Sequence, residues 1–177
     1  MRDSTEPLRK LARGMWNLIP WFAKELKFKY ASCNARLEEL AEKASYKLPW
    51  TGGQRFIVPA AEFFEPNWET GKHFRRAFER TDGDPWGLAG MWNTWIDKAR
   101  GEKHERYTML TLNTDRLPLM NRMHKPDLTR PLHVQDKRSV MPIALANVDF
   151  WRFGTIEEAS SLLKLPEVES IVAGPAK

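Results

Sequence analysis

The chain has 177 residues, 42% of them hydrophobic and 11% aromatic, which fits one domain with a substantial apolar core. Basic residues outnumber acidic ones by 28 to 23, and this excess of +5 suits a phosphate-bearing partner. The single cysteine excludes an internal disulfide and fits a reducing compartment. Apolar runs are too short for a membrane span, and the first residues are too polar for a signal peptide. We therefore expect a cytoplasmic protein without membrane partners.

The first part of the chain predicts two short strands and one helix. Residues 15–22 are dense in apolar groups and contain a proline, which indicates a buried strand followed by a turn. In residues 28–32, Phe28, Tyr30 and Ser32 alternate with Lys29 and Ala31. This period-two pattern predicts a strand that leads through Cys33 into Asn34. Residues 37–44 carry apolar groups at helical spacing, with Asn34 placed as the N-cap.

The middle of the chain predicts strands and short turns. Residues 56–60 form a strand by their β-branched and aromatic content. Residues 73–80 have two interpretations: one face of a helix, or the first strand of a β-hairpin whose second strand is the apolar run 86–92. Clusters of proline and glycine at residues 49–53, 83–85 and 126–131 predict turns within one domain rather than linkers between domains.

The last part of the chain predicts two further strands and two helices. The strands are expected at residues 107–112 and 140–145, and a short helix at residues 147–153. Thr155 and Glu158 have capping-box spacing, which predicts a helix start at Thr155. Several short strands with two or three helices fit an α+β domain with a mixed, curved and barrel-like β-sheet.

Two ionisable side chains could move protons. Glu65 lies in an aromatic run, where a carboxylate loses hydration and becomes a usable proton donor and acceptor near neutral pH. The alternative interpretation of Glu65 is a surface glutamate at the end of a strand. The imidazole of His124 could shuttle a proton or bind a sugar hydroxyl, or it could simply be a solvated side chain in a basic loop.

Other side chains could hold DNA. Arg36, close to Asn34 in the sequence, could bind a phosphate. The simpler interpretation of Arg36 is a solvated side chain, and that of Asn34 is a plain helix cap. The pair Trp21 and Phe22 could stack on bases of a single strand, or it could pack in the core. Thr111 lies within a predicted strand, where an ordinary strand residue is the simplest interpretation. The four histidines and one cysteine show no ligand spacing, so we expect no metal.

Several segments resemble the SOS-response-associated peptidase (SRAP) family of abasic-site-processing proteins. The resemblance runs from about Trp16 to the C-terminus and includes a phage-associated branch. The matching segments are Asn-Ala-Arg-Leu-Glu at 34–38, Val-Pro-Ala-Ala-Glu-Phe-Phe-Glu at 58–65, Glu-Pro-Asn-Trp-Glu-Thr-Gly-Lys at 65–72, Leu-Ala-Gly-Met-Trp-Asn-Thr-Trp at 88–95 and Met-His-Lys-Pro at 123–126. The resemblance also favours the β-hairpin for residues 73–92.

The resemblance implies roles for individual residues. Glu65 falls on the family's catalytic glutamate, and His124 is favoured over His133 as the catalytic histidine because of its Met-His-Lys-Pro context. The resemblance further implies that Asn34 contacts the abasic sugar and that Arg36 holds a phosphate. The remaining residues assigned to DNA binding are Trp21, Phe22, Thr111 and Arg138.

The resemblance also implies an activity: binding of abasic sites in single-stranded DNA, and a covalent protein–DNA crosslink through an N-terminal cysteine that autocatalytic removal of Met exposes. No cofactor is needed, because the nucleophile belongs to the chain. This chain begins Met1-Arg2, so we expect a single SRAP-like domain, residues 1–177, that lacks the family's N-terminal segment or starts upstream. The alternatives are a non-covalent single-stranded-DNA-binding remnant and a phage-associated interaction module without catalysis.

Overall fold

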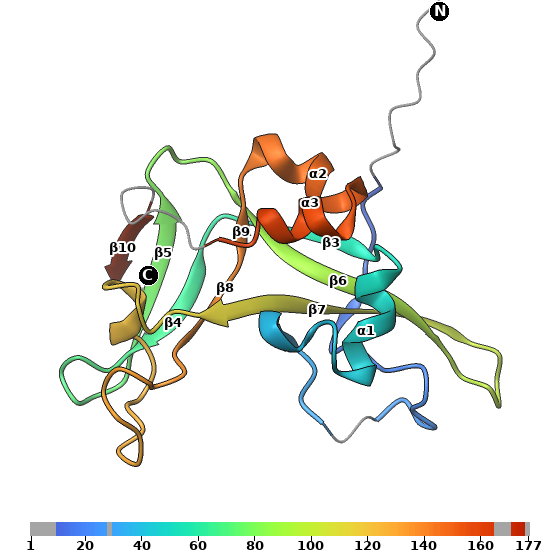
Figure 1. Ribbon diagram of the computed structural model, residues 1–177, viewed down its shortest axis with the longest axis horizontal. Helices are drawn as coiled ribbons and strands as arrows, with labels where there is room; N and C mark the ends of the chain where they lie inside the picture. The colour runs from blue at the N-terminus through green and yellow to red at the C-terminus, as the bar shows by residue number, and fades with distance from the viewer. Residues whose placement is uncertain (1–9, 28–29, 165–170, 176–177) are drawn as a thin grey trace, which may run out of the picture.

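The protein is described here from a computed structural model, which covers residues 10–27, 30–164 and 171–175 (Figure 1). A long antiparallel pair, β6 (Trp86–Ile96) and β7 (Lys103–Asn113), runs across the molecule and forms the centre of the larger sheet. Within the described residues this sheet has seven strands, and the central path is β1-β7-β6-β3. The other five strands are β1 (Met15–Trp16), β2 (Asn34–Arg36), β3 (Arg55–Ala60), β8 (Arg138–Val140) and β9 (Pro142–Ile143).

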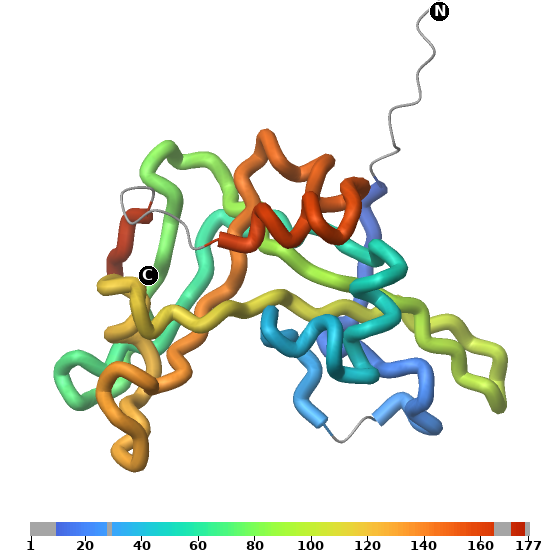
Figure 2. The backbone as a smooth tube through the Cα atoms, in the orientation of Figure 1, coloured from blue at the N-terminus to red at the C-terminus, as the bar shows by residue number. Residues whose placement is uncertain are grey.

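The larger sheet is mixed. Strands β1 and β2 run parallel to β7, whereas β3, β8 and β9 pair antiparallel with β6 or β7. As Figure 2 shows, this pairing brings the blue N-terminal part of the chain alongside the yellow β7, far from it in sequence. The predicted α+β class with a curved, mixed sheet is confirmed, although the sheet does not close into a barrel.

A smaller antiparallel sheet lies at one end of the larger one. Its order is β10-β5-β4, with β4 at Phe63–Asn67, β5 at Phe74–Arg80 and β10 at Ile171–Pro175. Figure 2 shows the red C-terminal strand beside the green β5. The strand predicted at 73–80 is confirmed, but the predicted hairpin is wrong. Strand β5 pairs with β4 and β10, whereas β6 pairs with β3, β7 and β9.

Three short α-helices pack against one face of the larger sheet, whereas the 3-10 helix at Met120–Arg122 belongs to the core on the other face. The α-helices are α1 (Ala44–Thr51), α2 (Val148–Phe153) and α3 (Ile156–Ser161), and the 3-10 helices are η1 (Leu37–Glu39), η2 (Met120–Arg122) and η3 (Leu145–Asn147). Helix α3 begins after Thr155 with both hydrogen bonds of a capping box, as predicted, and α2 lies where a helix was expected. No helix of the described residues is long and apolar enough to cross a membrane.

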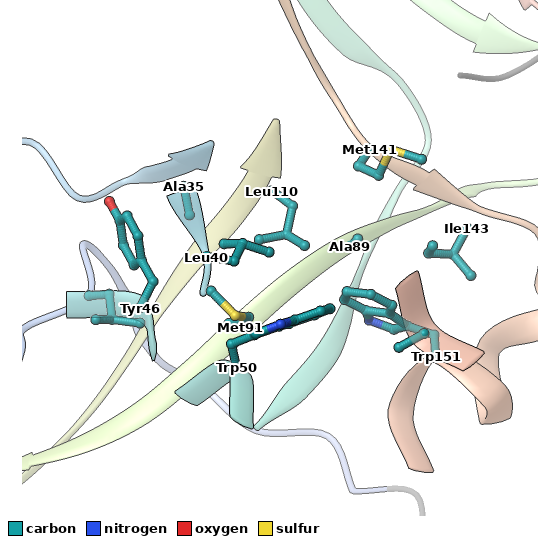
Figure 3. Packing of buried hydrophobic residues seen from close by; sticks show 12 residues of the cluster. Ala35, Leu40, Tyr46, Trp50, Ala89, Met91, Leu110, Met141, Ile143 and Trp151 are labelled. Carbon is teal, nitrogen blue, oxygen red and sulfur yellow. The ribbon is translucent and has the colours of Figure 1, made fainter. Parts of the chain in front are cut away.

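Two cores lie on opposite faces of the larger sheet. The first core packs the sheet against α1, α2 and α3 and includes Leu110, Met91, Trp50 and Trp151 (Figure 3). The centroids of the two tryptophan rings are 6.3 Å apart, and the guanidinium carbon of Arg55 lies 5.7 and 5.8 Å from them. The second core fills the space between the two sheets with residues that include Phe63, Phe78, Trp86, Leu88, Met120 and Met123. Because side chains alternate along a strand, each sheet residue faces one core or the other.

Near the N-terminus several predicted elements differ from the structure. Of residues 15–22 only Met15–Trp16 form a strand; both side chains are exposed, and the buried residues are Leu18 to Pro20. The strand predicted at 28–32 lies partly outside the described residues, and residues 30–32 are not a strand. Asn34 begins β2 instead of capping a helix, because residues 34–36 pair with β7. Pro49, predicted in a turn, lies inside α1.

Candidate nucleic-acid site

A histidine and a glutamate from separate elements meet where the two sheets adjoin. The Nε2 atom of His124 lies 3.0 Å from Oε2 of Glu65. The same nitrogen lies 2.8 Å from the backbone oxygen of Arg138. Both neighbours are hydrogen-bond acceptors, so Nε2 must carry the hydrogen. The candidate proton-transfer residues chosen from the sequence therefore lie in contact.

Glu65 is placed by the alternation of β4. Phe63, Glu65 and Asn67 point to the buried side of the small sheet, where Phe63 packs in the second core. Glu65 retains only 8% of its exposed surface, which is little for a carboxylate. Its partner His124 supplies the compensating hydrogen bond, so this buried carboxylate is not left without a donor.

Backbone contacts hold His124 in an unusual conformation. Its φ angle is 60°, in the left-handed region that non-glycine residues rarely adopt. Its N–H donates to the backbone oxygen of Pro66 at 2.6 Å, and its own carbonyl accepts from Nζ of Lys137 at 2.6 Å. The preceding Met123 forms a β-bridge with Asn67. These contacts from both sides fix the imidazole against β4.

The Glu65 carboxylate sets the charge state of the histidine. Chiefly through its hydrogen bond, Glu65 raises the pKa of His124, while burial and the nearby Lys137 act in the opposite direction. Burial also lowers the pKa of Lys137 itself. The arrangement favours a protonated imidazole beside a carboxylate, a pair that can exchange a proton with a bound group.

Two guanidinium groups lie beside this pair. Nη2 of Arg36 lies 3.1 Å from Oδ2 of Asp136. Arg138 donates to Glu38 with Nη1 at 2.9 Å and to Asp136 with Nε at 2.8 Å. The guanidinium of Arg138 lowers the pKa of Glu38, and the Glu38 carboxylate raises the pKa of Arg138. Both candidate phosphate-binding arginines therefore already hold carboxylates.

The strand register puts the polar candidates on one face of the sheet. Asn34 pairs with Met109, and Arg36 pairs with Thr111. Paired residues share a face, and Met109 packs against the second core, so all four face away from the helices. Asn34 and Arg36 are exposed there, whereas Thr111 is buried and its hydroxyl lies 3.4 Å from the Ala35 carbonyl.

The aromatic pair is accessible. Trp21 and Phe22 are 64% and 44% exposed, and their rings meet edge to face with centroids 5.7 Å apart. Neither ring belongs to the two buried cores. The segment is anchored by Trp95, whose Nε1 donates to the Ala23 carbonyl at 3.1 Å.

The aromatic pair and the histidine lie at opposite ends of β7. Trp95, which anchors the aromatic segment, pairs with His104, while Arg138, which contacts His124, pairs with Asn113. These rows are nine residues apart on β7, or about 30 Å along the strand at about 3.3 Å per residue. The structure therefore brings Glu65, His124, Arg36 and Arg138 together but does not bring Trp21 and Phe22 to them.

The structure also places His133 and Cys33, which lie outside the Glu65–His124 contact. His133 lies in an exposed loop, whereas His124 contacts Glu65. Cys33, partly buried, points its thiol toward the Trp16 carbonyl at 3.6 Å. The described residues contain no group of three or more His, Cys, Asp or Glu side chains that could hold a metal ion.

Sequence reasoning did not identify Asp136 and Lys137 as parts of the site. Asp136 contacts Arg36, a residue 100 positions earlier, and Lys137 binds the carbonyl of His124. Neither residue has a local pattern that predicts these contacts, because both contacts depend on tertiary structure.

Comparison with known proteins identifies the family of this chain. The family model described as SOS response associated peptidase (SRAP) matches residues 1–152. The chain belongs to the SRAP family. The abasic site processing protein YoqW of Bacillus phage SPbeta is 29% identical over 116 residues, which are 65% of this chain and 50% of YoqW. YobE of Bacillus subtilis, also an abasic site processing protein, is 46% identical over 56 residues, which are 32% of this chain and 25% of YobE.

Two solved structures are similar to this fold. The crystal structure of a Bordetella bronchiseptica protein matches with a TM-score of 0.83 at 30% identity, over 94% of this chain and 77% of that protein. A protein from Bacteroides thetaiotaomicron shares the fold with a TM-score of 0.77 at 24% identity, over 92% of this chain and 67% of that protein. The chain spans half or less of the length of the two Bacillus relatives named above.

Proposed function

We propose that this protein is a single SRAP-like domain that binds abasic sites in single-stranded DNA in the cytoplasm. The observation that carries the proposal is the Glu65–His124 contact of 3.0 Å beside the guanidinium groups of Arg36 and Arg138. A proton-transfer pair next to phosphate-binding groups suits a sugar that opens to an aldehyde within a DNA backbone. The names of the YoqW and YobE relatives support the same substrate.

Each residue has a proposed role in this site. Arg36 and Arg138 hold phosphates that flank the lesion, and Asn34, exposed on the same face, contacts the sugar. The Glu65 carboxylate accepts the proton that His124 releases, and His124 assists opening of the sugar ring. Thr111 lies behind Arg36 and fixes the strand that carries it.

A covalent step requires one more group. A thiazolidine forms when the thiol and the free α-amine of one N-terminal cysteine both add to the sugar aldehyde, with loss of water. Cys33 cannot do this, because its nitrogen belongs to the peptide bond with Ser32. Position 2 of the chain is Arg2. We therefore propose that the chain as printed binds its DNA without forming this stable adduct.

Binding measurements test the function. Fluorescence anisotropy would compare three oligonucleotides of one sequence: an undamaged single strand, a single strand with one abasic site, and the corresponding duplex with that site. We expect the abasic single strand to bind most tightly. Equal binding of the duplex, or no binding of any of the three, would contradict the proposal. The same assay with Asn34→Ala should remove the preference for the abasic strand while leaving the undamaged strand unaffected.

A further inference from the structure

Three guanidinium groups converge on one carboxylate beside the proposed site. Asp136 lies 3.1 Å from Arg36, 2.6 Å from Arg138 and 3.9 Å from Arg130. The three arginines come from β2, β8 and the loop at residues 125–136, so tertiary structure assembles the cluster. Arg130 has not been assigned a role above.

The cluster has the chemistry of a phosphate site. Guanidinium groups present several N–H donors in a plane, which fits a phosphate as well as a carboxylate. Arg36 and Arg130 are 49% and 47% exposed at their side chains, whereas Asp136 is 21% exposed. The cluster is thus open to solvent on the side of Arg36 and Arg130, and an external anion can approach both.

The loop holds the Asp136 carboxylate in place. Asp136 has a φ of 57°, and its N–H donates to the Asp115 carboxylate at 3.0 Å. Nε2 of Gln135 lies 3.2, 3.1 and 3.0 Å from the carbonyl oxygens of Asp127, Arg130 and Pro131, which share its two N–H donors. The same side chain accepts from the N–H of Asp127 at 2.8 Å. These bonds close the loop and present the carboxylate to Arg36.

We propose that Asp136 occupies the place of a DNA phosphate, and that Arg130 becomes a third phosphate ligand when Asp136 is displaced. The inference rests on the proposed DNA-binding function and adds a residue and an internal competitor to it. Rotation of the Asp136 side chain is sufficient for the exchange, so the loop closed by Gln135 does not have to open. The competitor lowers the affinity for damaged and undamaged strands by the same factor, so it weakens the binding of undamaged strands without changing the preference for the lesion.

The substitution Asp136→Asn tests the competition, because asparagine keeps the shape and tolerates the left-handed backbone. We expect a short oligodeoxythymidylate to bind roughly five- to tenfold more tightly, as expected for loss of a partly exposed ion pair. The matched control is Asp97→Asn, which changes the net charge equally in the turn between β6 and β7, where Asp97 caps Ala99. The control should change affinity less than twofold.

Arg130 is tested in the same background. Adding Arg130→Gln to Asp136→Asn should reverse most of the gain, since the freed phosphate ligand is lost. In the otherwise unchanged protein Arg130→Gln should have a smaller effect, because the carboxylates of Asp127 and Asp136, 3.2 and 3.9 Å from the Arg130 guanidinium, both compete with the phosphate for it. Equal losses in the two backgrounds would overturn the role of Arg130. Asp136→Gly, which also accepts a positive φ, is the second variant if Asp136→Asn does not fold.

Inorganic phosphate separates this inference from the proposed function. Melting temperatures would be compared in phosphate and in chloride at equal ionic strength. We expect phosphate to raise the melting temperature of Asp136→Asn more than that of the unchanged protein or of Asp97→Asn. If phosphate does so while no variant binds DNA, the proposed function fails, and what holds is only that Asp136 competes with an external phosphate at this arginine cluster. If Asp136→Asn gains neither phosphate nor DNA binding over Asp97→Asn, or loses binding, the inference is wrong.

Discussion

The imidazole of His124 lies 3.0 Å from the carboxylate of Glu65, and the two residues come from segments that meet only where the small sheet adjoins the large one. The contact couples a titration to the fold. Because Glu65 raises the pKa of His124, the folded protein binds a proton more tightly than the unfolded chain does.

The first prediction concerns pH and stability. An unfolded histidine has a pKa of about 6.5, so the contribution of the pair is fully present below that value. It is lost as the pH rises through the higher pKa of folded His124. We expect the free energy of unfolding to fall by less than about 1 kcal/mol across this window, since the ring is 35% exposed and screened by solvent. Urea unfolding at a series of pH values measures it.

The control for this prediction separates His124 from the other histidines. Glu65→Gln removes the carboxylate and should flatten the pH dependence, and NMR should show the pKa of His124 lower than in the unchanged protein. His133→Gln alters an exposed loop histidine and should leave the profile as it is. A profile unchanged by Glu65→Gln would show that the contact does not set the charge of His124.

The second prediction concerns salt. Arg36→Ala removes one phosphate contact, so single-stranded DNA should bind more weakly, and the slope of log affinity against log salt should decrease by about 0.7 in magnitude. Arg100→Ala, in the turn after β6, is the matched loss of charge and should have little effect. Anisotropy titrations at several salt concentrations provide both slopes. Equal slopes for the two variants would remove Arg36 from the DNA-binding surface.

The third prediction concerns the length of the DNA. Because Trp21 lies at the opposite end of β7 from His124, only a strand that spans the sheet can reach both. Trp21→Ala should reduce the affinity of long oligonucleotides by about 1–3 kcal/mol, the typical contribution of one stacked base. A trinucleotide with a central abasic site should bind both proteins equally. A loss for the trinucleotide would show that Trp21 acts beside the lesion.

The fourth prediction concerns covalent chemistry. The chain as printed should form no heat-stable adduct with an abasic oligonucleotide, and borohydride should trap at most an imine. Cys33→Ser should change neither result. Placing a Met-Cys N-terminal segment of the SRAP type before the chain should produce the adduct, and adding Glu65→Gln or His124→Ala should slow its formation or reversal. Denaturing gels followed by mass spectrometry measure the outcome. A heat-stable adduct on any residue of the printed chain refutes the mechanism.

The fifth prediction concerns packing on the face of the larger sheet opposite the α-helices. The Phe56 ring covers Gly90, and a Cβ added there would lie 2.2 Å from a ring atom. Gly90→Ala should therefore displace the ring from Tyr107, 5.4 Å away, and destabilise the protein by about 1–3 kcal/mol. Gly174→Ala, in β10, meets no atom within 4 Å and should be nearly neutral. Thermal unfolding compares the two variants.

Local patterns predicted the elements whose signal is local. The capping box before α3 and the β-branched, aromatic run of β3 both formed where expected. The N-terminal strands were misplaced because β2 is defined by pairing with β7, 75 residues away, and not by its own alternation. Residues 34–36 also fit a helix start, and the competition was decided by the partner strand.

The candidate site shows the same difference between what residue type predicts and what tertiary structure decides. Glu65 and His124 were selected by residue type and resemblance, and the structure brings them into contact. Burial of Thr111 and the distance between Trp21 and His124 could not be predicted, because they depend on sheet register. The carboxylate that faces Arg36 was also missed, since Asp136 reaches it only through the left-handed turn of its loop.

Strand β7 positions many of the residues discussed through its pairing with other strands. It pairs with β1, β2, β6 and β8, and these pairings set where Trp16, Asn34, Arg36 and Arg138 lie. Deleting one residue within β7 would turn each side chain beyond the deletion to the opposite face. Thr111 would then point at the helices, and the shifted register would break up the anion cluster. A substitution in β7 therefore changes one side chain at a time, whereas an insertion or deletion there would rearrange the whole site, and we expect changes in length to be tolerated only in turns such as 97–102.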